Sequence, residues 1–116
     1  MENTMVTGKH FCIDFDDTLC LKDDSVAPHA KEVLAGLKKA GHKITICSSR
    51  FNPKIWGELV ETRINKVKQW LRENDIQFDE ITAYKPSADV YIDDKGYRFE
   101  GNWEKALIDL KKILHL

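Results

Sequence analysis

The amino-acid sequence predicts an α/β fold built on a parallel β-sheet. Short apolar runs alternate with longer segments whose apolar residues recur every three or four positions. The first pattern is typical of buried strands and the second of amphipathic helices, and their alternation favours strand–helix–strand units. Acidic or hydroxyl side chains directly follow several of the apolar runs. Because ligands bind beyond the carboxyl ends of the strands in such sheets, these side chains are candidates for a functional site.

The first half of the chain contains two strand candidates with a helix between them. Residues 10–15 form an apolar run that ends in a group of acids. Residues 28–40 place apolar side chains on one helical face, and Gly41 is suited to end this helix. Residues 43–47 form the second strand candidate. This half therefore predicts one β–α–β unit.

The second half continues the alternation. A helix is expected over residues 54–73, starting at Asn52-Pro53, because proline is tolerated in the first helical turn. Two further strands are expected at 78–84 and 89–93, the last again ending in acids.

A final helix is expected at the C-terminal end of the sequence. Asn102 is a suitable N-cap for it. Its packing face is predicted to consist of four apolar residues: Trp103, Leu107, Leu110 and Leu114. Residues 97–100 are a candidate for a short fifth strand at the sheet edge.

The composition is that of an ordinary globular protein. A chain of 116 residues fits one domain, so residues 1–116 are expected to form a single unit. The net charge of −1 gives no electrostatic reason to expect nucleic acid. No apolar stretch suits a signal peptide or a membrane span, so no membrane partner is expected. The three cysteines form no CxxC pair, and reduced cysteines without an export signal indicate a cytoplasmic protein.

The acids after the first apolar run are the strongest chemical signal. Asp14, Asp16 and Asp17 follow a buried strand directly, and their mutual repulsion is costly unless something offsets it. Mg²⁺ is the expected compensation, since it prefers carboxylate oxygens. The alternative is a solvated turn in which Asp17 or Thr18 caps the next segment.

Three weaker signals follow later in the chain. Ser48 ends the second apolar run and could donate to a phosphoryl oxygen, although serines there are usually turn residues. Lys85 lies just past the third run and could neutralise a phosphoryl group, although most such lysines are simply exposed. Asp93 and Asp94 end the fourth run, as a metal site or a turn would require.

The order of these residues is more specific than any one of them. It resembles the four motifs of the haloacid dehalogenase (HAD) superfamily of phosphohydrolases: Asp14-x-Asp16-x-Thr18, then Ser48, then Lys85, then Asp93-Asp94. The likeness spans residues 10 to about 95. It implies a Rossmann-like three-layer sandwich with a central parallel sheet of four to five strands.

The resemblance also implies a catalytic role for four residues. Asp14 matches the nucleophile, which attacks phosphorus and forms an aspartyl-phosphate. Asp16 matches the general acid and base. Ser48 and Lys85 match the groups that bind the transferring phosphoryl oxygens.

The same resemblance implies a Mg²⁺ site. The matching ligands are the carboxylate of Asp14, the backbone carbonyl of Asp16, the carboxylate of Asp93 and, in a supporting position, Asp94. Two positions depart from the usual pattern: many members carry glycine where this chain has Asp17, and the second motif has Ser48 in place of threonine, which the family tolerates. Thr18 matches the hydroxyl that orders the loop. Residues expected to contact substrate are Thr18, Ser49, Arg50, Asn52 and Lys54.

The spacing between the motifs leaves no room for a cap domain. Family members insert caps after the first motif or between the second and third. Here residues 19–29 allow only a short flap, and residues 51–84 are occupied by one helix and one strand. The resemblance is therefore to the small capless type, whose site is open. A small phosphorylated substrate such as a sugar phosphate or nucleotide is expected, with a homo-oligomer possible as the cover of the open site.

Other functions use similar residues. A phosphotransferase would pass the same aspartyl-phosphate to an acceptor other than water. A phospho-receiver also combines acids, a hydroxyl and a lysine, but here an acid pair follows the lysine. A phosphate-binding module without turnover would bind magnesium and hydrolyse nothing.

Overall fold

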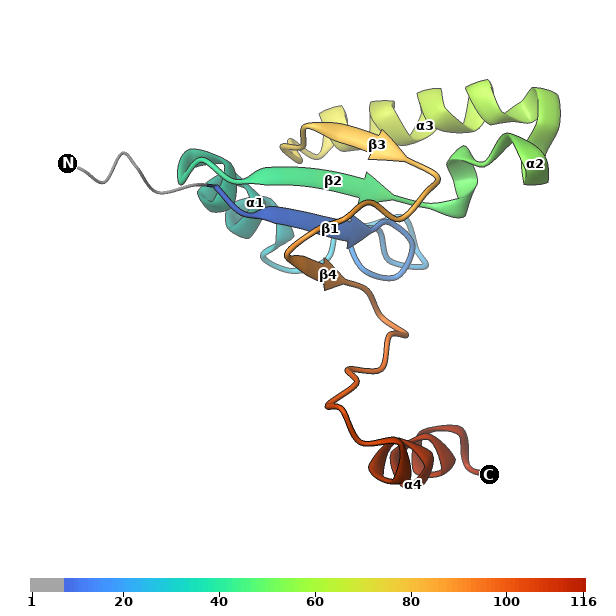
Figure 1. Ribbon diagram of the computed structural model, residues 1–116. Coiled ribbons are helices and arrows are strands. Elements are labelled where there is room, and N and C mark those ends of the chain that lie inside the picture. The colour runs from blue at the N-terminus through green and yellow to red at the C-terminus, as the bar shows by residue number, and fades with distance from the viewer. Residues whose placement is uncertain (1–7) are drawn as a thin grey trace.

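Four parallel strands form the centre of the computed structural model, which describes residues 8–116 (Figure 1). They are β1 (His10–Asp14), β2 (Lys43–Cys47), β3 (Glu80–Thr82) and β4 (Val90–Ile92). Their order across the sheet is β3-β2-β1-β4, and every neighbouring pair is parallel. The predicted Rossmann-like α/β fold is thus confirmed. The segment 97–100 is a loop and not a fifth strand. The prediction that no signal peptide is present concerns residues 1–7 in part, and these lie outside the described residues.

The helices lie close to their predicted ranges, with one break. They are α1 (Ala30–Lys39), α2 (Pro53–Trp56), α3 (Val60–Glu73) and α4 (Trp103–Leu114), with the 3₁₀ turns η2 (Ser49–Phe51) and η3 (Gly57–Leu59). The single helix expected over 54–73 is interrupted after α2 because Gly57 has a positive φ of 53°, which favours glycine. No helix in residues 8–116 has the length and apolar character needed to cross a membrane.

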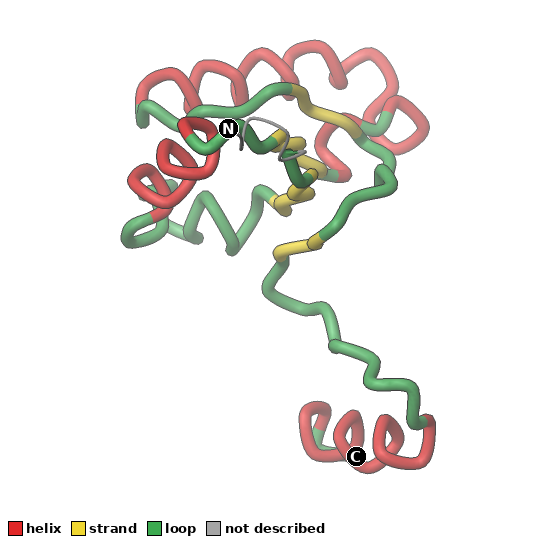
Figure 2. Tube along the Cα trace, turned by 60° about the vertical axis from the view of Figure 1, so that its left-hand side comes forward, coloured by secondary structure: helices red, strands yellow, loops and turns green. Residues whose placement is uncertain are grey.

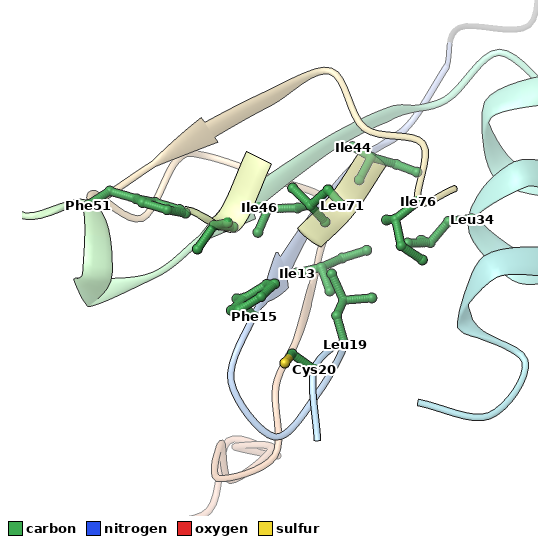
Figure 3. Close-up of a cluster of buried hydrophobic side chains, with 11 residues drawn as sticks. Ile13, Phe15, Leu19, Cys20, Leu34, Ile44, Ile46, Phe51, Leu71 and Ile76 are labelled. Carbon is green, nitrogen blue, oxygen red and sulfur yellow. The ribbon is translucent and has the colours of Figure 1, made fainter. Parts of the chain in front are cut away.

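The hydrophobic core lies between one face of the sheet and two helices. Ile13 of β1 pairs in register with Ile46 of β2, and both side chains are buried. They belong to one cluster with Leu34 of α1 and with Val67 and Leu71 of α3 (Figure 3). Because α1 and α3 pack on the same face, they hold β1 and β2 side by side with their carboxyl ends at one edge.

The connection between β3 and β4 covers part of the opposite face of the sheet. His10 bridges the two layers: its Nε2 lies 2.7 Å from Thr45 Oγ1, and its Nδ1 lies 3.0 Å from the Ser87 carbonyl oxygen. Thr45 is fully buried. These polar contacts of His10 fix the path of the chain between β3 and β4. They thereby help to position Lys85 and the residues after β4.

The last helix, α4, stands apart from the sheet (Figures 1 and 2). Its predicted N-cap is confirmed, since Asn102 Oδ1 accepts a hydrogen bond from the Lys105 N–H at 3.0 Å. Its predicted packing is wrong, because Trp103, Leu107 and Leu114 are 75%, 56% and 59% exposed. An amphipathic stripe predicts that a helix has an apolar face, but it does not specify what covers that face.

Candidate functional site

A pocket of about 460 Å³ lies at the carboxyl ends of β1, β2 and β4. Four of the predicted functional residues line it: Asp14, Lys85, Asp93 and Asp94. The other lining residues are Cys12, Cys47, Tyr91, Ile92, Lys95 and Gly96. The pocket is open, since Lys85 and the whole segment 91–95 are exposed. Parallel strand pairing thus brings the first, third and fourth sequence signals to one place.

Asp14 is the last residue of β1, and its surroundings disfavour its negative charge. Burial raises the pKa of its carboxyl group, and the charges of Asp94, Asp16 and Asp93 raise it further, against a hydrogen bond from the Phe15 N–H. Ionised Asp14 is therefore less favourable here than in water. A cation in the pocket would relieve this excess of negative charge.

The chemistry of these donors fits Mg²⁺. Asp14, Asp93 and Asp94 offer hard carboxylate oxygens around one pocket, which is the donor type that Mg²⁺ prefers. Within residues 8–116, however, no three His, Cys, Asp or Glu side chains are drawn together tightly enough to form a ready-made metal site. Because Mg²⁺ usually keeps several water ligands and needs few from the protein, a loose set of carboxylates is compatible with it.

The turn after β4 holds the Asp93 carboxylate. Its Oδ1 accepts hydrogen bonds from the Lys95 N–H at 3.0 Å and from the Gly96 N–H. A Cβ atom on Gly96 would lie 2.7 Å from Oδ1 and 2.9 Å from Oδ2 of Asp93. The backbone of residue 96 can approach this carboxylate so closely only because glycine has no side chain.

Gly96→Ala is therefore expected to turn the Asp93 carboxylate away and weaken Mg²⁺ binding about tenfold, as loss of an orienting partner around a metal typically does. The Mg²⁺ concentration that gives half-maximal activity measures the effect. Gly36→Ala in α1 is the matched control, because a Cβ there meets nothing within 4 Å. Equal Mg²⁺ requirements in both variants would contradict this role of Gly96.

Asp16 is held away from the pocket lining by Arg50. The Arg50 Nε donates to Asp16 Oδ2 at 3.0 Å, and its Nη2 donates to Oδ1 at 2.7 Å. This two-point pairing raises the pKa of Arg50. The guanidinium also lies 5.3 Å from the ring centre of Phe15. The two acids of the first motif therefore have different surroundings: Asp14 faces the pocket and Asp16 faces a fixed cation.

Ser48 and Asn52 form caps and do not line the pocket of Asp14. Buried Ser48 accepts a hydrogen bond on Oγ from the Arg50 N–H at 3.1 Å. Asn52 Oδ1 accepts from the Lys54 N–H at 2.9 Å and caps α2. The carbonyl of Ser49 accepts a hydrogen bond from the Trp56 indole at 2.9 Å. None of Ser48, Ser49, Asn52 or Lys54 lines the pocket of Asp14.

The loop after Asp14 also explains the departure at Asp17. Asp17 has a φ of 61°, in the left-handed region that glycine adopts freely and aspartate tolerates. Its carboxylate pairs with Lys22 at 3.0 Å. Thr18 Oγ1 is buried and has no hydrogen-bond partner within the described part of the chain. Thr18 thus lies inside the loop and not in the pocket.

Sequence reasoning did not assign several pocket residues. Tyr91 lies under Lys85, whose Nζ is 4.2 Å from the ring centre. Cys12 and Cys47 lie in the pocket wall, and burial raises the pKa of Cys12 to about 11, which keeps it a neutral thiol. Alternation along β4 could have placed Tyr91 on the same face as Cys12, its partner in register. The sequence alone did not indicate that Cys12 and Cys47 lie in the same pocket wall.

One family of known proteins matches part of the chain. A family described as haloacid dehalogenase-like hydrolase matches residues 11–60. The matched span contains β1 with its acids, α1, β2 and Ser48. This match supports membership of the haloacid dehalogenase superfamily. No curated protein matched the chain.

The match to this HAD-like family supports a hydrolase that acts on a small-molecule substrate. Lys85, Asp93 and Asp94 lie beyond the matched span, yet they share a pocket with Asp14. Residues 19–29 form turns, and residues 51–84 hold only short helices, α3 and β3. Both places where HAD proteins insert caps are thus too short for one, as in the small capless type.

Proposed function

We propose that the chain is a Mg²⁺-dependent phosphatase that hydrolyses phosphomonoesters through an aspartyl-phosphate on Asp14. The observation that carries this proposal is the pocket shared by Asp14, Lys85, Asp93 and Asp94. It combines a carboxylate nucleophile, a cation for the phosphoryl oxygens and two further carboxylates. Bound Mg²⁺ would be held by Asp14, Asp93 and Asp94 with the Asp16 carbonyl, and it would offset repulsion between the carboxylates and the substrate phosphate.

In the first step Asp14 attacks the substrate. A carboxylate oxygen of Asp14 forms a bond to phosphorus, and the bond from phosphorus to the leaving oxygen breaks. Asp16, once turned from Arg50 and protonated, donates its proton to that oxygen, so the alcohol leaves neutral. Lys85 stabilises the charge on the transferring phosphoryl group, as would the Ser48 hydroxyl once turned from the Arg50 N–H.

In the second step water releases the phosphate. Ionised Asp16 takes a proton from water as the water oxygen bonds to phosphorus. The bond between phosphorus and Asp14 breaks, which restores the carboxylate and frees inorganic phosphate. Asp16 ends the cycle protonated, as it began.

The open pocket favours substrates that are bound mainly by their phosphate. Sugar phosphates and nucleotides fit this proposal, with residues 1–116 acting as one cytoplasmic domain. A second subunit covering the pocket would supply the water exclusion that a cap provides in other HAD proteins.

Hydrolysis of p-nitrophenyl phosphate with and without Mg²⁺ tests the proposed function. Phosphate release is expected with Mg²⁺ and its loss is expected with a chelator, followed by recovery when Mg²⁺ is restored. A screen over sugar phosphates and nucleotides then identifies the substrate. Mg²⁺ binding without any phosphate release would indicate a binding module, and stable phospho-aspartate in the resting protein would indicate a receiver.

A further inference from the structure

A second, basic pocket is lined in part by Arg50, the residue that holds Asp16. It has a volume of about 250 Å³ and is lined by Arg50, Leu59, Thr62, Arg63 and Lys66. Three of these five residues are cations, one is a hydroxyl and none is an acid. Asp24 lines an adjoining cavity and not this one.

The pocket is formed by one face of α3 and the turn η2. Thr62, Arg63 and Lys66 follow Leu59 by three, four and seven residues. This spacing places all four on one helical face. α3 and η2 pack together through the core, where Phe51 of η2 and Val67 of α3 are both buried. The cations are therefore gathered by packed secondary structure.

These cations have unused hydrogen-bond donors. Arg63 and Lys66 form no ion pair with any acid in residues 8–116. The Arg63 guanidinium lies over the Trp56 ring, 3.4 Å from its centre, which orients it without neutralising it. Arg50 gives two of its five N–H groups to Asp16, so three remain.

Arg50 connects this pocket to the reaction. The same guanidinium lines the basic pocket and holds both oxygens of Asp16, the proposed general acid and base. An anion bound between Arg50, Arg63 and Lys66 would therefore be separated from Asp16 only by the Arg50 side chain.

We propose that this basic pocket binds a second anionic group of the substrate. This proposal rests on the proposed function and narrows it: the substrates are small phosphomonoesters that carry another phosphate or a carboxylate. Guanidinium and ammonium groups bind both anions, and Arg50 and Arg63 can each bind them at two points.

Charge reversal at Lys66 tests the proposal, because Lys66 is exposed and its replacement leaves the core intact. Lys66→Glu is compared with Lys68→Glu, an equal charge change on the same helix at an exposed residue outside the pocket. The substrates are a sugar bisphosphate and the matching monophosphate, with a phosphoglycerate and glycerol phosphate as the carboxylate pair.

For wild type, kcat/KM is expected to favour the doubly anionic member of a pair about tenfold, the value of one charge-assisted contact. Lys66→Glu should remove this preference and Lys68→Glu should keep it. The pair that shows the preference distinguishes a second phosphate from a carboxylate. A wild type without preference in either pair, or equal effects of the two variants, would overturn the proposal.

A binding measurement separates this proposal from the proposed function. Calorimetry with the sugar bisphosphate is performed on Asp14→Asn protein, which is expected to bind without turnover, alone and combined with each lysine variant. Affinity that falls about tenfold with Lys66→Glu and not with Lys68→Glu supports the basic pocket even if no phosphatase activity is found. Equal affinities in the two double variants would contradict it even if the chain is a phosphatase.

Discussion

Asp14→Asn is expected to lower phosphatase activity by a factor on the order of a thousand or more, because an amide cannot form the aspartyl-phosphate. Release of p-nitrophenolate at saturating Mg²⁺ measures the loss. Asp17→Asn is the matched control, since it also replaces an acid of this loop by its amide. Asparagine tolerates the left-handed backbone of residue 17 as aspartate does. Full activity in Asp14→Asn would rule out Asp14 as the nucleophile.

The same substitution is expected to stabilise the protein in the absence of Mg²⁺. Burial and neighbouring acids raise the pKa of Asp14, so its ionised form is less favourable in the folded than in the unfolded state. The resulting loss of stability begins as pH rises through the unfolded-state pKa and is complete above the folded-state pKa.

Thermal unfolding therefore gives a second readout for Asp14→Asn. At neutral pH without Mg²⁺ its Tm should exceed that of wild type, and the difference should shrink as pH falls below the unfolded-state pKa of Asp14. A lower Tm at neutral pH would mean that the carboxylate is stabilised by contacts in the folded state.

Asp16→Asn is the second substitution with a large expected effect. Activity on an alkyl phosphate should fall by about 10²–10⁴, because its leaving alkoxide needs a proton. p-Nitrophenyl phosphate should still phosphorylate Asp14, because nitrophenolate leaves without one. The second step then lacks its base, so a burst of one nitrophenolate per protein is expected before slow turnover.

Arg50→Gln provides the comparison for Asp16→Asn. It breaks the same two hydrogen bonds but leaves the carboxylate in place. No burst is expected for Arg50→Gln, since Asp16 can still activate water. If both variants show the same kinetics, the contact between Arg50 and Asp16 is needed for structure and Asp16 has no separate role in proton transfer.

Much of the fold follows from local patterns. The second strand lies where the apolar run predicted it, at Lys43–Cys47, because consecutive β-branched residues suit a buried strand. The break at Gly57 was missed, since a lone glycine within a helical pattern is often tolerated. The exposure of α4 was missed as well, because its apolar stripe carries no information about distant contacts.

The sequence also predicted one part of the candidate site and missed another. The order of its motifs, from Asp14 to Asp94, predicted a common pocket because parallel strands end at one edge of the sheet, and four of the residues do line it. Local rules predicted the helix start at Asn52 and a turn role for Ser48, and both residues act as caps. Their absence from the pocket of Asp14 depends on how the chain turns after β2.

The sequence by itself determined the α/β class, the strand ends and the acids that follow them, because these depend on periodicity and on residues close together in the chain. Only the tertiary structure decided that Arg50 holds Asp16 and that Arg63 and Lys66 join Arg50 in one pocket. The physical reason is that the packing of α3 and η2 on one face of the sheet brings together side chains whose spacing carries no joint pattern.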